Sequence, residues 1–596
     1  MLRKSLAGLL LLLTISMTVK SQIKIGFEIS FKEPQAHYAE VEMNISGLAK
    51  DYVDVKMPVW TPGSYLVREF AKNIEGFTAT AGGKSIKFEK IRKNAWRIYH
   101  AKAKDIKLNY RVYANEVSVR TSFITDEHAF LSSTGIFMYP DGMLNLPSTV
   151  KIHPFNGWNK VSTGLEPVTN QPFSYTAQNF DILFDSPIEV GNQDVFEFTA
   201  SGVKHEVAMF GGGNYDKEKL KVDMAKIVEQ GTAIYGENPN KHYTFIVHNF
   251  EAGGGGLEHL NSTVLGATRT AYTSETGYKS FLNLVAHEYY HLWNVKRLRP
   301  AALGPFDYDN ENYTTSLWVA EGFTSYYENK LMFRAGFFTL EETAQTLATA
   351  IAGVVNTPGS RVQSAAEASY DAWIKAYRPN ENSNNSTISY YSKGEVMGLL
   401  MDLEITHATK GAKNLDDVMK AMYTEYYKKQ GRGYTDAKFK AMVEKISGIS
   451  FNPFWEKYVN GTGPIDYAKY FGYAGILVKD ENAGMKVPYL GVASKKIEGG
   501  IIVSAVSRNS AAWEGGLNVN DEVISVDGIP VEAAIERMPT ITGKNIGDEV
   551  TIMIRRDGIV KDIKIKLKAA TSVKLVTQLD EKASASQLKV RTAWLK

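Results

Sequence analysis

The sequence contains no cysteine among its 596 residues. This absence excludes a disulfide framework, a thiolate ligand for a metal ion and a cysteine for lipid attachment near the N-terminus. Any metal ion bound by this chain must therefore be held by histidine and by carboxylates.

The sequence also lacks an excess of charge of either sign. Residues 1–21 contain Arg3, Lys4 and Lys20 and no acidic residue, and the remainder has 65 basic and 65 acidic side chains. Such a balance provides no electrostatic attraction to nucleic acid or to an anionic membrane surface. We therefore expect no nucleic-acid partner.

Long hydrophobic runs are missing except at the N-terminus. There Arg3 and Lys4 precede an apolar run of about a dozen residues, which is too short to span a membrane. The order of basic, apolar and small residues is that of a cleavable export signal. We expect residues 1–21 to be removed and the mature chain to be periplasmic or extracellular, without stable membrane insertion. The alternative is an N-terminal membrane anchor.

Length and residue patterns predict several domains and a multidomain α+β fold. A chain of 596 residues exceeds the size of one hydrophobic core. β-Branched and aromatic residues between turn signals predict an all-β domain at 22–195, and longer periodicities indicate an α/β domain at 196–330. Apolar residues at spacings of three to four predict a mostly helical region at 331–478. Short strands and glycine turns follow at 484–570, and we expect a C-terminal tail at 571–596.

The stretch "NLVAHEYYHLWNVKR", residues 283–297, carries two histidines four positions apart. Four residues are about one helical turn, so His287 and His291 project from one helix face, with Glu288 beside them. This is the H-E-x-x-H pattern, in which two imidazoles grip a divalent metal ion. With 11 histidines, a chain of this length shows the pattern by chance in roughly one case in a hundred, so it favours zinc.

A histidine pair needs at least one more protein ligand, and catalysis requires an open position for water. Glu321, in "LWVAEGFTSYYEN", is flanked by apolar and aromatic residues, a setting that suits a ligand better than a solvated face. Glu328 is the rival acid. The alternative roles for Glu321 are a glutamate at a helix start and a member of a buried ion pair.

The W-x-x-E-G-F pattern around Glu321, after H-E-x-x-H, is similar to the gluzincin metallopeptidases, which bind zinc through two histidines and a glutamate. The strings "HEYYHLWNVKRLRP" (287–300), "MPVWTPGSYLVREFAKN" (57–73) and "GGGLEHLNS" (254–262) resemble the glycyl aminopeptidase family of that group, with an attached PDZ module. The resemblance covers most of the chain after the signal. It implies a thermolysin-like catalytic domain at 196–330, one zinc ion per chain, and cleavage after small N-terminal residues such as glycine or alanine.

The resemblance also implies roles for individual side chains. Zinc acidifies water and polarises a carbonyl group, and Glu288 is placed to take the proton of the water and hand it to the leaving amine. A tyrosine in the Y-x-K-G motif of gluzincin aminopeptidases stabilises the oxyanion, and here that motif is residues 391–394. Tyr391 is therefore the expected donor, and its neighbour Tyr390 is the competitor.

The glycines before Glu258 resemble the G-x-M-E-N string by which related aminopeptidases bind substrate along an edge strand. Gly255 and Gly256 would let the substrate backbone approach closely. Glu258 would pair with the free α-ammonium group, so peptides with a free N-terminus are the expected substrates. The alternative is a flexible glycine loop with an exposed acid.

Two features depart from the pattern of the better-known alanyl aminopeptidases. Glu321 lies 30 residues after His291, a longer gap than in those relatives, so the loop at 298–315 must bulge near the site. His259 stands where those relatives have asparagine. Neither the loop nor His259 has an assigned role.

The string "PYLGV", residues 488–492, resembles the carboxylate-binding loop of PDZ domains. In such loops, backbone N–H groups capture a C-terminal carboxylate while the peptide adds to the sheet as a strand. Tyr489, Leu490, Gly491 and Val492 are the expected binding residues, and peptide or protein C-termini are the expected ligands. Asn520 stands where PDZ domains usually have glycine. The alternative is a small β-rich module without a ligand.

Three alternative functions are consistent with these residues. The leading interpretation is a secreted zinc aminopeptidase. A zinc endopeptidase that selects protein substrates with its PDZ domain is the nearest alternative, but an ammonium anchor at Glu258 would penalise internal peptide segments. The third is a PDZ-bearing binding protein on an inactive peptidase scaffold, but such a scaffold has no need to keep the base Glu288.

Overall fold

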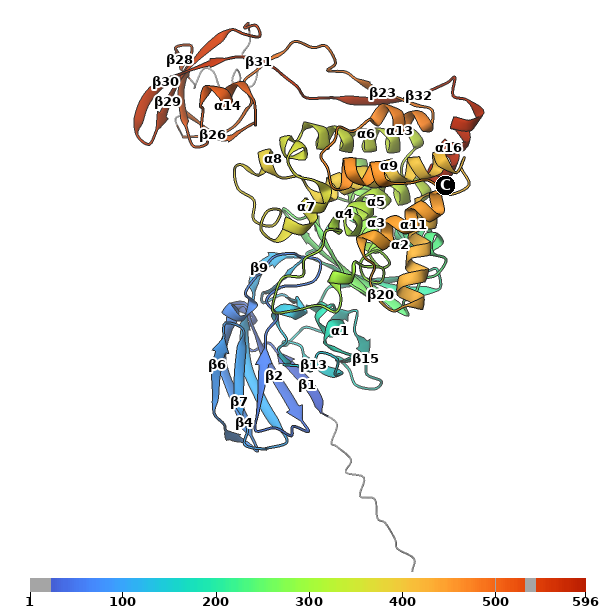
Figure 1. Cartoon of the computed structure of the whole chain (residues 1–596). Helices are drawn as coiled ribbons and strands as arrows, with labels where there is room; N and C mark the ends of the chain where they lie inside the picture. Colours follow the sequence, from blue (N-terminus) through green and yellow to red (C-terminus); the bar gives the residue numbers. More distant parts are fainter. Residues whose placement is uncertain (1–22, 499, 531–542) are drawn as a thin grey trace, which may run out of the picture.

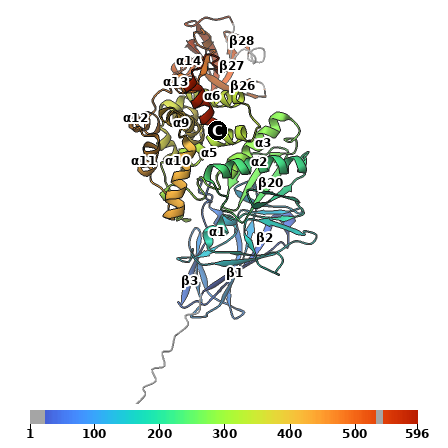
Figure 2. The same cartoon turned by 90° about the vertical axis from the view of Figure 1, so that its right-hand side faces the viewer.

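The computed structural model describes residues 23–498, 500–530 and 543–596 (Figure 1). The export signal expected at 1–21 lies outside these residues. A β-rich N-terminal domain and a small C-terminal domain, placed where the PDZ module is expected, lie at opposite ends of a central domain rich in helices (Figures 1 and 2). The predicted multidomain α+β fold is confirmed. None of the helices in these ranges is both long and apolar enough to cross a membrane.

Apart from three short 3-10 helices, the described part of the N-terminal domain consists of strands and one short α-helix. They are β1 (Lys24–Ser30), β2 (Tyr38–Ser46), β3 (Tyr52–Lys56), β4 (Ile74–Ala81), β5 (Lys84–Ser85), β6 (Phe88–Arg92), β7 (Ala95–Tyr99), β8 (Ile106–Tyr113), β9 (Asn115–Ser118), β10 (Thr121–Ile124), β11 (Ala129–Leu131), β12 (Tyr139–Pro140), β13 (Ser148–His153), β14 (Lys160–Thr163), β15 (Glu166–Pro167), β16 (Ser174–Ala177), α1 (Phe180–Phe184) and β17 (Ile188–Gly191). The sheets run in the orders β15-β16-β13-β1-β2-β8-β4-β5, β14-β17-β11-β10-β9 and β12-β3-β7-β6. In β2, alternate residues such as Val41, Met43 and Ile45 face the core, as the period of two predicts.

The central domain begins with a mixed sheet that carries one edge of the functional site. Its strands are β18 (Asp194–Ala200), β19 (Val203–Phe210), β20 (His242–Phe250), β21 (Gly256–Glu258) and β22 (Ser262–Thr268). The order is β18-β19-β20-β22-β21, so the short strand β21 lies at an edge, antiparallel to β22. An edge strand has one row of backbone groups that no neighbouring strand uses.

Helices cover this sheet and continue into the region after it (Figure 1). They are α2 (Lys217–Tyr235), α3 (Glu275–Tyr290), α4 (Leu317–Ala320), α5 (Gly322–Arg334), α6 (Leu340–Asn356), α7 (Ala365–Tyr370), α8 (Ser383–Ser386), α9 (Tyr390–Ala408), α10 (Leu415–Met422), α11 (Asp436–Ser447), α12 (Asn452–Phe454) and α13 (Tyr467–Tyr473). One continuous hydrophobic core joins helices on both sides of residue 330. The regions 196–330 and 331–478, expected as two domains, therefore share one hydrophobic core.

The small C-terminal domain has the strands of a β-rich module around a short helix. They are β24 (Pro488–Tyr489), β25 (Val492–Ile497), β26 (Gly500–Val506), α14 (Ala511–Gly515), β27 (Glu522–Val526), β28 (Ile529–Pro530), β29 (Glu549–Arg556), β30 (Ile559–Lys566) and β31 (Lys568–Ala569). The module has a separate hydrophobic core. Two flanking strands, β23 (Ile476–Asp480) and β32 (Leu575–Leu579), pair with each other and connect the module to the central domain.

The segment 571–596, expected as a C-terminal tail, returns to the central domain. It contains β32 and the helix α16 (Ala585–Leu595). Trp594 is fully buried in the core of the central domain, and its indole Nε1 donates to the Tyr326 hydroxyl at 2.8 Å. The small domain is therefore an insertion into the central domain, because chain on both sides of it belongs to that unit.

Candidate active site

Helix α3 presents the two histidines of the H-E-x-x-H stretch one turn apart. Ser274 caps its N-terminus by accepting a hydrogen bond from the Gly277 amide, which fixes where the helix begins. The Nε2 atoms of His287 and His291 face each other at 3.2 Å, and both side chains are largely or fully buried. The predicted common helix face is therefore present.

Glu321 completes a group of three side chains, with His287 and His291, whose ligand atoms could hold a metal ion; we call these three residues the donor group. It lies between α4 and α5, is 2% exposed, and places Oε2 at 3.2 Å from His291 Nε2 and 3.8 Å from His287 Nε2. Ligands about 2.1 Å from a tetrahedral zinc ion are about 3.4 Å apart. The other carboxylate atom, Oε1, is buried without a hydrogen-bond partner in the described part of the chain. The three side chains therefore fit one zinc ion.

Hydrogen bonds behind the histidines orient their rings. His287 Nδ1 donates to Glu328 Oε2 at 2.6 Å, and Asn283 holds the other Glu328 oxygen at 2.8 Å. His291 Nδ1 donates to the Asn294 carbonyl at 3.0 Å. Both rings thereby present an Nε2 lone pair to the space that they share with Glu321, as ligating histidines do. The rival acid Glu328 lies behind the His287 ring and is an orienting residue.

For each of the two acids of the site, Glu321 and Glu288, burial raises the pKa and the neighbouring imidazoles lower it. Burial raises the pKa of Glu321, but the imidazoles of His291 and His287 lower it by more, to about 2. Burial raises the pKa of Glu288 to about 7, against the effect of the same imidazoles. Glu321 is thus held ionised, whereas Glu288 is the acid whose proton is most easily exchanged near neutral pH.

Glycine at position 256 allows Glu288 to lie against the edge strand. A Cβ atom at Gly256 would come within 2.1 Å of Glu288 Oε1, so a side chain there would displace the carboxylate. Glu288 Oε2 is buried and has no hydrogen-bond partner within the residues described. Gly256 is thus approached by the proposed base, Glu288, while the close approach of a substrate backbone stays a prediction. Gly255 adopts φ +77, a conformation that favours glycine.

Glu258 ends the edge strand β21 close to this acid. Its side chain is 4% exposed, and its carboxylate, that of Glu288 and a ring nitrogen of His291 all lie within 4.8 Å of one another. Lys296 Nζ is 3.9 Å from Glu258 Oε1 and is the nearest cation among the ion pairs of the described residues. Glu258 is thus a buried carboxylate beside the donor group, and no cation of the described residues lies closer to it than Lys296.

The loop at 57–74, which contains one of the strings that carry the family resemblance, reaches the same carboxylate. A Cβ atom at Gly63 would lie 2.7 Å from Glu258 Oε1, and Gly63 adopts φ +86. The Tyr377 hydroxyl donates to the Gly63 carbonyl at 3.3 Å. The loop therefore packs directly on Glu258 and limits the space in front of it.

The loop at 298–315, whose role the sequence left open, joins the central domain to the N-terminal domain. Asp309 accepts hydrogen bonds from Lys56 at 2.7 Å and from Asn94 at 2.8 Å. The Trp60 indole donates to the Asp307 carbonyl at 2.8 Å. Because Trp60 precedes Gly63 in the chain, this loop supports the turn that contacts Glu258 and does not itself supply a side chain to the donor group.

His259 contacts an acid outside the donor group through its Nδ1 atom. Its Nδ1 lies 3.0 Å from Asp185 Oδ1, and Asp185 also accepts from the Leu260 amide and from Lys296 Nζ, each at 2.8 Å. Burial raises the pKa of Asp185, but Lys296 and His259 lower it to about 2. This ion cluster holds the end of β21 and the Lys296 side chain in place.

Tyrosines form the opposite wall of the site. Tyr391, at the start of α9, stacks with the His287 ring at a centroid distance of 6.3 Å. Tyr390 stacks on Tyr391, and its hydroxyl is buried without a partner among the residues with described positions. Sequence reasoning missed Tyr65 and Tyr377, which are close enough to the acids of the site to have their pKa values raised by burial and by those charges. Their only sequence signal was the aromatic content of their segments.

A second histidine–glutamate group lies where the N-terminal and central domains meet. His128 Nδ1 is 2.6 Å from one oxygen of the fully buried Glu189, and His248 Nε2 is 2.9 Å from the other. These separations are those of hydrogen bonds and are shorter than the spacing of ligands around one metal ion. The group is therefore a hydrogen-bonded contact between domains.

The expected carboxylate-binding loop lies between β24 and β25. Leu490 is buried in the core of the module, and a Cβ atom at Gly491 would come within 2.1 Å of Ser510 Cβ. Asn520 adopts φ +71, which explains why glycine suits this position. Tyr489 is exposed and Val492 begins β25. Residues 531–542 of the module lie outside the described residues.

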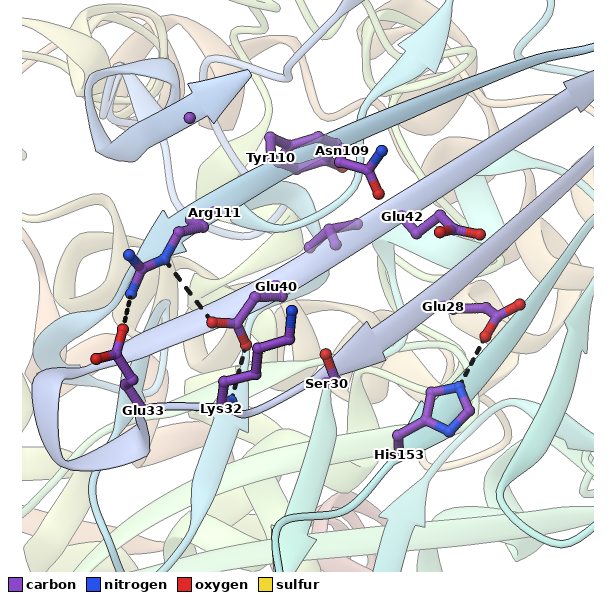
Figure 3. Close-up of a pocket in the computed structure, with 12 residues that line it drawn as sticks. Glu28, Ser30, Lys32, Glu33, Glu40, Glu42, Asn109, Tyr110, Arg111 and His153 are labelled. Atoms are coloured by element: carbon purple, nitrogen blue, oxygen red, sulfur yellow. Dashed lines mark hydrogen bonds and ion pairs between the residues drawn. The ribbon is translucent and has the colours of Figure 1, made fainter. Parts of the chain in front are cut away.

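A surface pocket of the N-terminal domain is unrelated to the donor group (Figure 3). Arg111 pairs there with Glu33 at 2.8 Å and with Glu40 at 3.7 Å, and His153 lies 2.8 Å from Glu28. None of the residues that the sequence singled out lines it. The pocket therefore carries no part of the predicted chemistry.

Comparison with known proteins identifies the same three parts of the chain. Residues 26–192 match the peptidase M61 N-terminal domain, residues 280–397 match M61 glycyl aminopeptidase, and residues 488–567 match the PDZ domain. The predicted family resemblance and the predicted PDZ module are confirmed. The segment that matches M61 glycyl aminopeptidase, residues 280–397, contains the donor group of His287, His291 and Glu321.

Solved structures and one curated relative add to these matches. The fold is similar to that of an aminopeptidase N family protein from Idiomarina loihiensis, with 29% identity, a TM-score of 0.88, and coverage of 96% of this chain and 100% of that one. An M1 zinc metallopeptidase mutant from Deinococcus radiodurans, bound to a Tyr-Ser-Ala substrate, has 12% identity, a TM-score of 0.47, and coverage of 74% and 95%. A stretch of 71 residues is 32% identical to the serine protease Do-like HtrA of Lactobacillus helveticus, covering 12% of this chain but only 17% of that protein.

Proposed function

We propose that this chain, whose residues 26–192 and 280–397 match the peptidase M61 N-terminal domain and M61 glycyl aminopeptidase, is a zinc aminopeptidase that removes the first residue of peptides with a free N-terminus. The observation that carries the proposal is the position of Glu258, a buried carboxylate within 4.8 Å of Glu288 and His291. A carboxylate there can pair with an α-ammonium group one residue away from the bond to be cleaved. Small first residues, glycine or alanine, suit the space that Gly63 limits.

The residues present fit zinc, and their roles follow from their contacts. His287, His291 and Glu321 would hold the ion, which when bound acts as a Lewis acid that acidifies water and polarises a carbonyl group. Glu328 keeps the His287 ring in the ligating tautomer through its 2.6 Å hydrogen bond to Nδ1. One ion per chain is proposed, because the second histidine–glutamate group uses its facing atoms in hydrogen bonds.

Proton transfer is assigned to Glu288. The water oxygen forms a bond to the carbonyl carbon, Glu288 accepts the proton, and the C–N bond breaks as Glu288 returns that proton to the leaving amine. The Glu288 carboxylate has an unpartnered oxygen for this purpose and lies against the edge strand on which the substrate would lie. Tyr391 is the proposed donor to the oxyanion that develops on the carbonyl oxygen, and Tyr390 is its competitor.

Two variants test the metal site and the base separately. Glu321→Gln should lose zinc and activity together, as measured by elemental analysis and dipeptide hydrolysis, because one of three ligands is weakened. Glu288→Gln should keep zinc and lose at least about a hundredfold in turnover, the scale of a general base. Glu251→Gln, in the exposed loop before β21, is the control. Full zinc content in Glu321→Gln would remove Glu321 from the ligand set.

A zinc endopeptidase that uses its PDZ domain to select protein substrates remains the second candidate. The PDZ match at 488–567 favours it, because such a module can bind a protein C-terminus. Hydrolysis of an internal bond in an N-acetylated peptide, at a rate similar to that of the free peptide, would support this candidate over the aminopeptidase. The basic and apolar residues at 1–21 support the further proposal that the protein is exported, which N-terminal sequencing of the mature chain would test.

A further inference from the structure

Arg120 reaches the site from the N-terminal domain, and nothing in the proposed mechanism uses it. It lies between β9 and β10, where its amide donates to Ser118 Oγ at 3.1 Å and its carbonyl accepts from Ser132 Oγ at 3.2 Å. These contacts fix the backbone from which the side chain extends. Its guanidinium Nη2 donates to the Gly256 carbonyl at 3.2 Å, so the side chain crosses from one domain to the edge strand of the other.

Among the described residues, the Arg120 guanidinium forms no salt bridge. Its Nε is buried without a hydrogen-bond partner, and its Nη2 donates to a backbone carbonyl, that of Gly256. Burial lowers the pKa of Arg120, but Tyr377 and Tyr391, and after them the carboxylates of the site, raise it by more, so the charge is kept. A partly buried guanidinium that makes no ion pair is costly unless a ligand supplies one. Carboxylate is the anion that its planar donor pattern fits.

The spacing of residues along the edge strand β21 sets the distance between the Arg120 guanidinium and Glu258. The Gly255 carbonyl accepts from the Gly266 amide, so it faces β22, whereas the Gly256 carbonyl, one residue on, faces the free edge and meets Arg120. Gly256 and Glu258 are two residues apart on β21, a separation of about 7 Å in a strand. An extended dipeptide spans about the same distance from its amino to its carboxyl end.

We infer that Arg120 binds the C-terminal carboxylate of the substrate and that dipeptides are the preferred substrate class. The inference rests on the proposed function, because it needs the α-ammonium group at Glu258 and a scissile bond beside Glu288. A dipeptide antiparallel to β21 then has its first residue at Glu258, its one peptide bond beside Glu288, and its carboxylate at Arg120. A longer peptide would have to pass Arg120, since that side chain occupies the free edge at Gly256.

The test compares substrates that differ only at the C-terminus. We would measure kcat/KM of the wild-type zinc enzyme for Ala-Ala, for Ala-Ala amide, and for an alanine pentapeptide as free acid and as amide. The acid form of the dipeptide should exceed its amide by about tenfold to a hundredfold, the scale of a hydrogen bond between charged groups. The pentapeptide acid and amide should be equal, because their C-termini lie beyond Arg120.

Two variants and a control assign the preference to Arg120. Arg120→Ala should bring the ratio of acid to amide close to one by losing activity on the acid alone. Arg120→Lys keeps a charge without the two-pronged donor pattern and should give an intermediate ratio, and it also serves if the alanine variant does not fold. Arg111→Ala removes an arginine of the same domain that already pairs with Glu33 and Glu40 (Figure 3), and it should keep the wild-type ratio.

The possible results distinguish a failure of this inference from a failure of the proposed function on which it rests. Equal rates on Ala-Ala and its amide by the wild type would overturn the carboxylate site and leave the aminopeptidase intact. An equal loss on acid and amide in Arg120→Ala would also overturn it, because Arg120 would then act on the peptide backbone. Absence of hydrolysis of any free-amine peptide by the zinc-loaded wild type would overturn the proposed function, and the inference with it.

Discussion

Replacing Glu258 tests the contact that separates an aminopeptidase from an endopeptidase. Its carboxylate is 4% exposed, and its nearest cation is Lys296 at 3.9 Å, beyond hydrogen-bond distance. An α-ammonium group in front of it would form a charge-assisted hydrogen bond worth about 1.5–3 kcal/mol. That range corresponds to a change in kcat/KM of about tenfold to 150-fold. Lys296 repels an incoming ammonium group, which favours the lower half of the range.

The assay uses Glu258→Gln, which keeps the size of the side chain and removes its charge. Wild type should hydrolyse Ala-Ala and reject N-acetyl-Ala-Ala. The variant should lose about tenfold to 150-fold on Ala-Ala and gain nothing on the acetylated peptide, while elemental analysis shows unchanged zinc. Glu251→Gln, an exposed glutamate in the loop before β21, is the matched control and should behave as wild type.

The refuting result concerns blocked substrates. If wild type cuts N-acetylated peptides internally as fast as it cuts free ones, the ammonium anchor does not exist. Unchanged kcat/KM on Ala-Ala in Glu258→Gln would lead to the same conclusion. Neither result would affect the zinc ligands, since His287, His291 and Glu321 do not depend on Glu258.

Further predictions concern stability and the orientation of the ligands. Glu328→Gln should weaken zinc retention by about tenfold to a hundredfold in competition with a chelator, because His287 loses its orienting carboxylate. Asp185→Asn should reduce the free energy of unfolding by about 2 kcal/mol at pH 7, because the fold lowers this pKa from 3.8 to about 2. A lowered pKa stabilises the fold above the unfolded value, so this difference should shrink as the pH falls from 4 towards 2 in urea titrations. Trp594→Ala should lower the free energy of unfolding by about 3–5 kcal/mol. Replacing residues 484–570 with a short linker should preserve dipeptide hydrolysis, because Asp480 and Leu575 on the two flanking strands are paired.

The parts of the site that one helix carries were predictable from the sequence. The spacing of His287 and His291 depends only on the helical period, and Glu288 follows in the chain. Glu321 could be proposed from its apolar neighbours, but Glu328 was an equal competitor by residue type. Only the packing of α5 against α3 shows that Glu328 meets His287 Nδ1 while Glu321 faces both Nε2 atoms.

Residues that reach the site from other domains had no such local signal. Arg120 follows a strand of the N-terminal domain and contacts Gly256 only after the two domains dock. Gly63 belongs to a string that carries the family resemblance, but its contact with Glu258 depends on the loop at 298–315. Periodicity reports which face of an element is buried and does not report which distant segment buries it.

The same limitation explains the differences in domain boundaries. Apolar spacing at 331–478 predicted helices correctly in kind, but it could not show that they share a core with 196–330. The residue pattern at 571–596 was too short to predict a packed helix, so this segment was interpreted as a tail. Trp594 reveals their role only through its contact with Tyr326, 268 positions earlier in the chain.

The place of α16 has a consequence for how the protein is made. Domains generally fold as units while the chain emerges from the ribosome, the N-terminal ones first. The N-terminal β domain and the inserted module each have a separate core and can form during synthesis. The core of the central domain includes Trp594 and Leu595, which are synthesised after the N-terminal domain and the inserted module. That core can therefore be completed only after both other domains have been made, so both can fold before it does.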